Sequence, residues 1–281
     1  MKASDFSYEN PNSLNAALAL LANQDGDVQL LAGGQSLMPM MNFRLAAPDT
    51  LVDLNGVKEL QFIQETETSI EIGAMTRYVQ LEQSPLVTQH IPLFAKALPH
   101  IAHSAIRNRG TIGGSAALAD PAAEMPALLI ALGATLNLQS LTGQRSVLAD
   151  DFFLGLYETT LADGEIIESI SIPKLASTDR TGFYELARRH GDYAMAGVAV
   201  VDRVVGDLAS LRVVFFAISD RPVRDQKMED LLQRPSANDE QQHLKEAIGQ
   251  LEFHGDLNAD AATKQHLAGV VLNRALKEME T

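Results

Sequence analysis

The chain has 281 residues, 22 Lys and Arg against 36 Asp and Glu, a formal net charge of −14 and a hydrophobic fraction of 46%. This composition is typical of a folded globular protein and excludes wholesale disorder. The length allows one large domain or two average ones. The excess of negative charge argues against a general nucleic-acid-binding function, which needs cationic residues to neutralise phosphates.

Cysteine is absent, which excludes disulfides, thiolate-bound zinc and iron–sulfur clusters held by this chain. The N-terminal segment is polar and has no apolar leader. The longest apolar stretch, residues 126–136, is shorter than the roughly 18 residues that indicate a membrane span. We therefore expect a cytoplasmic protein without a membrane span.

Hydrophobic spacing predicts the elements of the N-terminal half. Apolar residues from Leu14 to Leu21 repeat at helical spacing, and Ser13 is a candidate N-cap. Strands are expected at 28–31 and 51–54, a hairpin at 62–64 and 70–72, and helices from about 76 and over 92–99.

The middle of the chain carries a further helix and two strands. Asp120 and Pro121 fit the N-cap and first position of a helix over 122–132, and Gly133 fits the residue that ends it. Strands are expected at 135–139 and 165–172.

Pro173 and the small polar residues up to Asp179 indicate a linker. We therefore place a domain boundary near residue 175, with domains at 1–175 and 176–281. The second domain is expected to hold three strands, at 182–188, 197–205 and 211–218 with a turn at 205–208, and closing helices of which the last covers 261–279. The whole is an α+β protein whose smaller second unit has a three-stranded sheet.

Two glycine pairs are the candidate binding elements. Gly33-Gly34 follows a predicted strand, and Gly113-Gly114 is flanked by Thr111 and Ser115. Glycine lets the main chain approach a ligand closely, and successive N–H groups in such a turn bind anions. Together the two loops can hold one pyrophosphate from both sides, although most glycine pairs are only turns. Neither pair matches the Rossmann or P-loop pattern.

Four stretches resemble one family. The segments LLAGGQSLMPMMNFRLAAPDTLVDLN (30–55) and RNRGTIGGSAALADPAAEMPALLIALGA (107–134) strongly resemble the FAD-binding medium subunit of the molybdenum hydroxylases, the family of carbon monoxide dehydrogenase and xanthine dehydrogenase. The segments PNSLNAALALLA (11–22) and FYELARRHGDYAMAGVAV (183–200) are similar to the same family. The resemblance covers essentially the whole chain.

The resemblance implies a two-lobed FAD-binding domain of the PCMH (vanillyl-alcohol-oxidase-like) type at 1–175 and a carbon monoxide dehydrogenase flavoprotein-like domain at 176–281. It implies one FAD and no catalytic or metal-binding residue of this chain. The positions that match the FAD contacts of the family are Leu30, Leu31, Ala32, Gly33, Gly34, Gln35, Ser36, Leu37, Ile101, Ala102, Thr111, Ile112, Gly113, Gly114, Ser115, Glu124, Ile167 (or Ile166), Tyr184 and Tyr193.

Two of these positions keep an alternative. Glu124 matches a carboxylate that contacts FAD and can accept hydrogen bonds from ribose hydroxyls, but it is also a favourable acid in the first turn of a helix. Tyr193 matches an aromatic near the isoalloxazine ring, or belongs to the core of the second domain. Gln35 stands where some relatives have His, and the chain has no Cys. We therefore expect noncovalent FAD.

The resemblance also implies the function. A large partner subunit holds molybdopterin, a small one holds two [2Fe–2S] clusters, and the flavin subunit passes the electrons to an external acceptor within a dimer of heterotrimers. Two alternatives are a free-standing PCMH-type flavin oxidoreductase with its own substrate, and a noncatalytic module whose glycine loops are only turns. The sequence indicates neither the substrate of the complex nor its acceptor.

Overall fold

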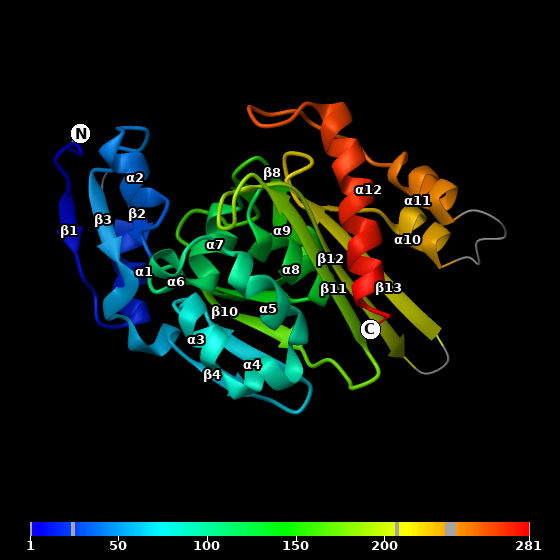
Figure 1. The fold of residues 1–281 in the computed structure, drawn as a ribbon. Helices are drawn as coiled ribbons and strands as arrows, with labels where there is room; N and C mark the ends of the chain where they lie inside the picture. Colours follow the sequence, from blue (N-terminus) through cyan, green and yellow to red (C-terminus); the bar gives the residue numbers. More distant parts are fainter. Residues whose placement is uncertain (1, 24–25, 206–207, 234–239, 281) are drawn as a thin grey trace.

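The computed structural model describes residues 2–23, 26–205, 208–233 and 240–280. They form a small N-terminal lobe, a central lobe and a C-terminal unit, which follow one another across Figure 1 from blue through green to red. This is the α+β architecture, with two lobes and a third unit, that the sequence predicts. In the described part of the chain, no helix is long and apolar enough to cross a membrane.

The N-terminal lobe is built on a parallel sheet in the order β1 (Ser7–Glu9), β3 (Thr50–Asp53) and β2 (Val28–Leu31). Helix α1 (Leu14–Asn23) packs its apolar side against β3 and the two short 3-10 helices after it, η1 (Leu54–Gly56) and η2 (Lys58–Leu60). The Ser13 hydroxyl accepts from the Ala16 amide at 3.2 Å, which confirms the predicted N-cap. Helix α2 (Leu37–Asn42) begins directly after the first glycine pair.

The central lobe has a five-stranded sheet in which every neighbouring pair is antiparallel. Its order is β4 (Ile63–Glu65), β5 (Ser69–Gly73), β10 (Ile166–Pro173), β6 (Thr135–Ser140) and β7 (Gly143–Leu148). The helices are α3 (Tyr78–Gln83), α4 (Pro85–His90), α5 (Pro92–Ala97), the 3-10 helix η3 (Leu98–His100), α6 (Ser104–Arg107), α7 (Ile112–Leu118) and α8 (Glu124–Leu132). The short helix α9 (Ala149–Phe152) follows β7. It leads into a hairpin of two strands, β8 (Phe153–Gly155) and β9 (Glu158–Thr159).

Helix α8 lies at the centre of the molecule, and all nine of its residues are buried. It ends at Gly133, whose φ of +66° confirms the predicted helix end. Its predicted start is wrong, because the helix begins at Glu124 rather than at Ala122. The Asp120 carboxylate accepts from the Ala122 amide at 2.9 Å, and the Pro121 carbonyl accepts from Ala217 of the C-terminal unit at 2.7 Å. The backbone of Pro121 is therefore used by a distant segment rather than by a helix.

The C-terminal unit is an antiparallel meander of β11 (Arg180–Ala187), β12 (Ala194–Val205) and β13 (Leu208–Phe216). A fourth strand of two residues, β14 (Val223–Arg224), pairs with β13. The sheet therefore has four strands, whereas the sequence predicted three. The predicted turn at 205–208 includes residues 206–207, which lie outside the described residues.

The strands of this meander alternate between two cores. Val198 and Val200 of β12 pack with the helices α10 (Gln226–Leu232), α11 (Glu240–Ile248) and α12 (Ala261–Glu278). Ala199 and Val201 point to the other face and join the core around α8. The sheet therefore stands between α12 and the central lobe (Figure 1). One hydrophobic core includes buried residues from both sides of residue 175. The domain boundary at that position therefore stays a prediction.

Candidate functional site

The two glycine loops lie against each other. A Cβ atom on Gly33 would stand 2.8 Å from the Cα of Gly110 and still closer to the carbonyl oxygen of Arg109. A Cβ on Gly114 would stand 3.1 Å from the Cβ of Ala32. Two segments from different lobes therefore meet backbone to backbone, and only glycine fits at position 33.

A cavity of about 860 Å³ opens beside this contact, within the range of about 300–1,000 Å³ that small-molecule sites occupy. Its wall includes residues from all three units of the fold. The predicted site residues that line it are Leu30, Ala32, Gly33, Gly34, Gln35, Ser36, Leu37, Ile101, Ala102, Thr111, Gly113, Gly114, Ser115, Glu124, Ile167 and Tyr193.

Three predicted site residues do not line this cavity. Leu31 faces a smaller hollow behind the first loop. Ile112 is fully buried in the central core. Tyr184 lies in β11, where its ring stands 4.9 Å from the guanidinium of Arg274 and its hydroxyl accepts from that group at 2.6 Å. Because successive side chains of a strand point to opposite faces, Tyr184 points toward the helices of the C-terminal unit.

The first loop presents free backbone donors. Among the described residues, none accepts a hydrogen bond from the N–H groups of residues 33–37. Gly34 has a φ of +73°, and the Gln35 side-chain amide donates to the Gly33 carbonyl at 2.8 Å, which holds the turn. The Ser36 hydroxyl makes no capping bond to α2. Consecutive free N–H groups in a turn form a concave site for anionic oxygens.

The second loop is different, because its amides are used within the protein. Gly113 donates to the carbonyl of Ala74 at 2.9 Å, Gly114 to the Thr111 hydroxyl at 3.1 Å, and Ser115 to the Thr111 carbonyl at 3.1 Å. Thr111 is thus the N-cap of α7. The expectation that both loops offer free amides holds only for the first one. The second loop supplies a close-packed wall opposite to it.

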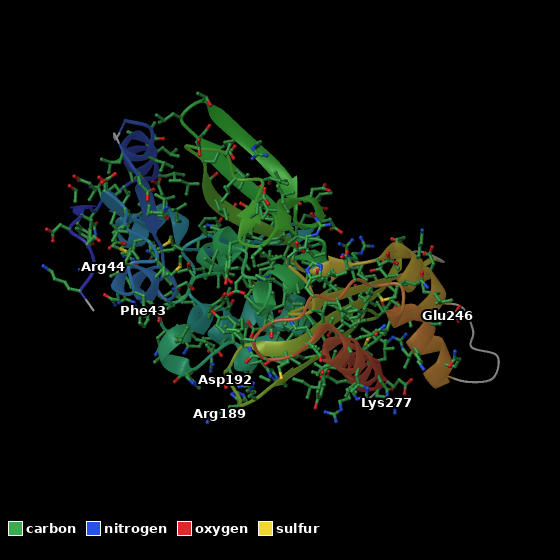
Figure 2. The ribbon with its side chains drawn as sticks, turned by 90° about the horizontal axis from the view of Figure 1, so that it is seen from above. Phe43, Arg44, Arg189, Asp192, Glu246 and Lys277 are labelled. Carbon is green, nitrogen blue, oxygen red and sulfur yellow. The ribbon has the colours of Figure 1, made fainter. Side chains whose placement is uncertain are left out.

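Tyr193 reaches the cavity from the turn between β11 and β12, on which Figure 2 labels Arg189 and Asp192. Gly191 of this turn has a φ of +86° and packs against His103 and Ala102. Tyr193 is 60% exposed, so it does not belong to the core of the C-terminal unit. Burial of its hydroxyl, together with the charge of Asp120, raises the pKa of Tyr193 to about 12.

Glu124 is a nearly buried acid in the cavity wall, 7% exposed, at the first position of α8. Burial raises the pKa of Glu124 to about 8, and the negative charges of Glu185 and Asp120 act in the same direction. The side chain is therefore mainly protonated at neutral pH. A protonated carboxyl donates a hydrogen bond, whereas the sequence suggested an accepting carboxylate, and a neutral group gains little from the helix dipole.

Several cavity residues were missed from the sequence. Tyr78 of α3 is buried, its hydroxyl is hydrogen-bonded to Ser115, and burial raises its pKa. Asp120 was interpreted as a helix cap, yet it lines the cavity and binds the hydroxyls of Tyr193 and Tyr157. The loop 161–165 also lines the cavity. No local pattern marks these residues, because the packing of β5, α3 and β10 brings them together.

Two family models match the chain. The FAD binding domain in molybdopterin dehydrogenase matches residues 4–175, and the CO dehydrogenase flavoprotein C-terminal domain matches residues 182–279. The chain belongs to the FAD subunits of the molybdenum hydroxylases. It is therefore the FAD-binding subunit of a molybdopterin-dependent oxidoreductase complex. This confirms the resemblance seen in the sequence.

Relatives in this family match this FAD subunit over nearly its whole length. The carbon monoxide dehydrogenase medium chain of Hydrogenophaga pseudoflava is 39% identical over 274 residues, 96% of each chain. The caffeine dehydrogenase subunit beta of Pseudomonas sp. (strain CBB1) is 37% identical over 286 residues, 98% of this chain and 95% of the relative.

Solved structures agree with this. Carbon monoxide dehydrogenase from Hydrogenophaga pseudoflava, in a form that lacks the Mo-pyranopterin moiety, superimposes with a TM-score of 0.94 at 39% identity and covers 100% of this chain and 99% of the other. Quinoline 2-oxidoreductase from Pseudomonas putida 86 has a TM-score of 0.91 at 37% identity, with 99% and 98% covered.

Proposed function

We propose that this FAD subunit takes electrons from [2Fe–2S] clusters of a small partner subunit and passes them to an external acceptor. A large partner subunit with molybdopterin oxidises the substrate, and two such heterotrimers form the complex. Bound FAD supplies the redox chemistry, because it exchanges electrons singly or in pairs, while the protein supplies binding and orientation. The observation that supports this most directly is the row of free N–H groups at residues 33–37, held beside a cavity of suitable size.

The residues present fit a dinucleotide. The free amides of the first loop suit the diphosphate, and the hydroxyl of Ser36 adds a donor. The second loop, residues 111–115, closes the opposite side, and Gly33 allows the two loops to approach. Ile101 and Ile167 offer apolar wall for a flavin, and Tyr193 an aromatic one.

We further propose that FAD is bound noncovalently. Gln35 occupies the first loop, and a carboxamide is not a nucleophile, unlike the His imidazole or Cys thiol that covalent attachment uses; its amide donates to the Gly33 carbonyl. The sequence has no Cys. Denaturation of the flavin-loaded chain should release all of the FAD into the supernatant, and flavin retained in the protein pellet would contradict this.

The electron route is tested on the assembled complex. Substrate of the large subunit should bleach the flavin only when the [2Fe–2S] subunit is present, and native mass measurement should give two copies of each of three chains. Bleaching of the isolated chain by a small substrate would favour the free-standing flavin oxidoreductase instead. A chain that takes up no FAD would favour the noncatalytic module.

The two domains at 1–175 and 176–281 and the cytoplasmic location remain parts of this proposal. Limited proteolysis should cut the segment between β10, which ends at Pro173, and β11, which begins at Arg180. Cell fractionation tests the location.

A further inference from the structure

The carbonyl groups of the first loop are hydrogen-bonded within the protein, whereas the N–H groups of residues 33–37 donate to no other described residue. The Gly33 carbonyl accepts from the Gln35 side chain at 2.8 Å, and the Gly34 carbonyl accepts from an amide of α2 at 3.1 Å. The Ala32 carbonyl, just before them, is held by a side chain from outside the loop. This division suits an anion, because N–H groups attract it and a carbonyl oxygen turned toward it would repel it.

Asn55 is the side chain that holds the Ala32 carbonyl. Its Nδ2 donates to that oxygen at 2.9 Å and to Oδ1 of Asp53 at 2.6 Å. A carbonyl and a carboxylate only accept hydrogen bonds, so the nitrogen of the amide must face both of them. Asp53 pairs with Leu31 in the parallel ladder of β3 and β2. A residue two positions after Asp53 therefore reaches across the end of β2 to the loop.

Asp53 fixes the orientation of Asn55. The carboxylate of Asp53 is 8% exposed, and its Oδ1 also accepts from the backbone N–H of Asn55 at 2.9 Å. Its Oδ2 accepts from the Tyr8 hydroxyl of β1 at 2.5 Å. On the other side, Nε2 of Gln61 donates to the Asn55 carbonyl at 3.2 Å. Asn55 is thus held by bonds to three segments, although neither it nor Asp53 lines the cavity.

The peptide group between Ala32 and Gly33 carries this constraint to the cavity. A trans peptide is planar, and its C=O and N–H point in opposite directions. The bond from Asn55 to the Ala32 oxygen therefore aims the Gly33 N–H away from Asn55. The Gly33 nitrogen stands 4.0 Å from the position of a Cβ on Gly114, on the side where the second loop closes the cavity.

We propose that Asn55, oriented by Asp53, is a positioning residue for the diphosphate of FAD. Its amide holds the Ala32 carbonyl so that the row of N–H groups beginning at Gly33 faces the cavity. The inference rests on the proposed function, because the anion that these N–H groups receive is the diphosphate of the proposed FAD site. Asn55 acts only through the loop and does not touch the ligand.

Titration of the apoprotein with inorganic pyrophosphate, followed by the amide NMR signals of its glycines, tests this orientation. The Gly33 and Gly34 signals should shift in the wild type. Asn55→Asp has the same size but turns an acceptor toward two acceptors, so these shifts should be lost, while the signal of Gly133 at the end of α8 stays and reports an intact fold. Asn258→Asp, the same change at an exposed position, should behave as the wild type. Shifts that persist in Asn55→Asp, or that are missing in the wild type, would overturn the proposal.

Titration with FAD measures the consequence for the cofactor. Asn55→Asp should weaken FAD binding about tenfold or more, whereas Asn258→Asp should not change it. Asn55→Leu, which removes the donor without adding charge, replaces Asn55→Asp if that variant does not fold. A merely structural Asn55 would lower the denaturation midpoint and leave the affinity and the two glycine shifts in place. If the wild-type chain binds no FAD, the proposed function fails, while the pyrophosphate titration still decides the role of Asn55.

Discussion

Gly33 and Gly110 touch where two loops from different lobes meet, and a Cβ on Gly33 would stand 2.8 Å from the Cα of Gly110. The contact fixes the free amides of residues 33–37 against the wall formed by residues 111–115. The geometry of the whole cavity therefore depends on the absence of one side-chain carbon atom.

Gly33→Val should abolish FAD retention, because the new side chain forces the two loops apart. The visible flavin absorbance of the purified chain measures this, and the overpacking should cost about 1–3 kcal/mol of stability. Gly269→Ala is the matched control, since a Cβ there meets nothing within 4 Å and alanine favours the helix by about 1 kcal/mol. Stoichiometric FAD in Gly33→Val would show that the loops are not a joint cradle.

Tyr193→Ala should weaken FAD binding about tenfold, because an aromatic contact contributes about 0.5–1.5 kcal/mol beyond its buried area. Tyr193→Phe keeps the ring and removes only the hydroxyl beside Asp120, so its affinity should stay close to that of the wild type. Tyr184→Phe should have no effect, because Tyr184 contacts Arg274 away from the cavity. Titration of apoprotein with FAD gives all three values, and a strong loss in Tyr184→Phe would contradict the placement.

Glu124→Gln should change how stability depends on pH. The pKa of Glu124 is raised from 4.5 to about 8 on folding, so between these values the folded chain holds a proton that the unfolded chain has lost. The free energy of unfolding therefore falls as pH rises, by up to about 1.4 kcal/mol per pH unit for this group, and the contribution is complete below pH 4.5 and lost through pH 8.

Denaturant titrations of the apoprotein at several pH values measure this slope. Glu124→Gln should remove it, so that the difference in stability between the variant and the wild type grows with pH. Glu246→Gln is the control, because its carboxyl is exposed. Parallel curves for Glu124→Gln and the wild type would mean that the acid is ionised in the folded state.

Arg212→Leu should destabilise the chain by about 1–3 kcal/mol without direct effect on the cavity. Its guanidinium donates to the carbonyl of Ile130 at the end of α8 from Nε at 3.1 Å and from Nη2 at 2.6 Å, and it pairs with Asp150. The substitution removes these bonds of a charged donor, while the Ile130 carbonyl keeps the Gly133 amide and Asp150 keeps Arg224. Chemical denaturation measures the loss, with Lys277→Leu on the exposed side of α12 as the control (Figure 2). Equal stability of the two variants would contradict the role of Arg212.

The start of α8 was predicted wrongly from the sequence, and the reason lies in tertiary structure. Asp120 and Pro121 have the local chemistry of a helix start, and the same reasoning located the end of α8 at Gly133 correctly. The predicted start of the helix was wrong because the backbone N–H of Ala217, almost a hundred positions away, donates to the Pro121 carbonyl. A local pattern carries no information about a hydrogen-bond donor from a distant segment of the chain.

Local spacing was enough to predict most strands and the two glycine turns, because periodicity, caps and tight turns depend on neighbouring residues. The family was inferred from the resemblance of four segments to its members. Only the folded chain determined that the amides of the first loop are free while Gly113 donates to Ala74, and that Tyr184 faces away from the cavity. Only the folded chain also buries Glu124 beside other acids, which raises its pKa. Hydrogen-bond partners and the dielectric surroundings of a charge depend on segments that come together only on folding. The local sequence around each residue therefore does not predict them.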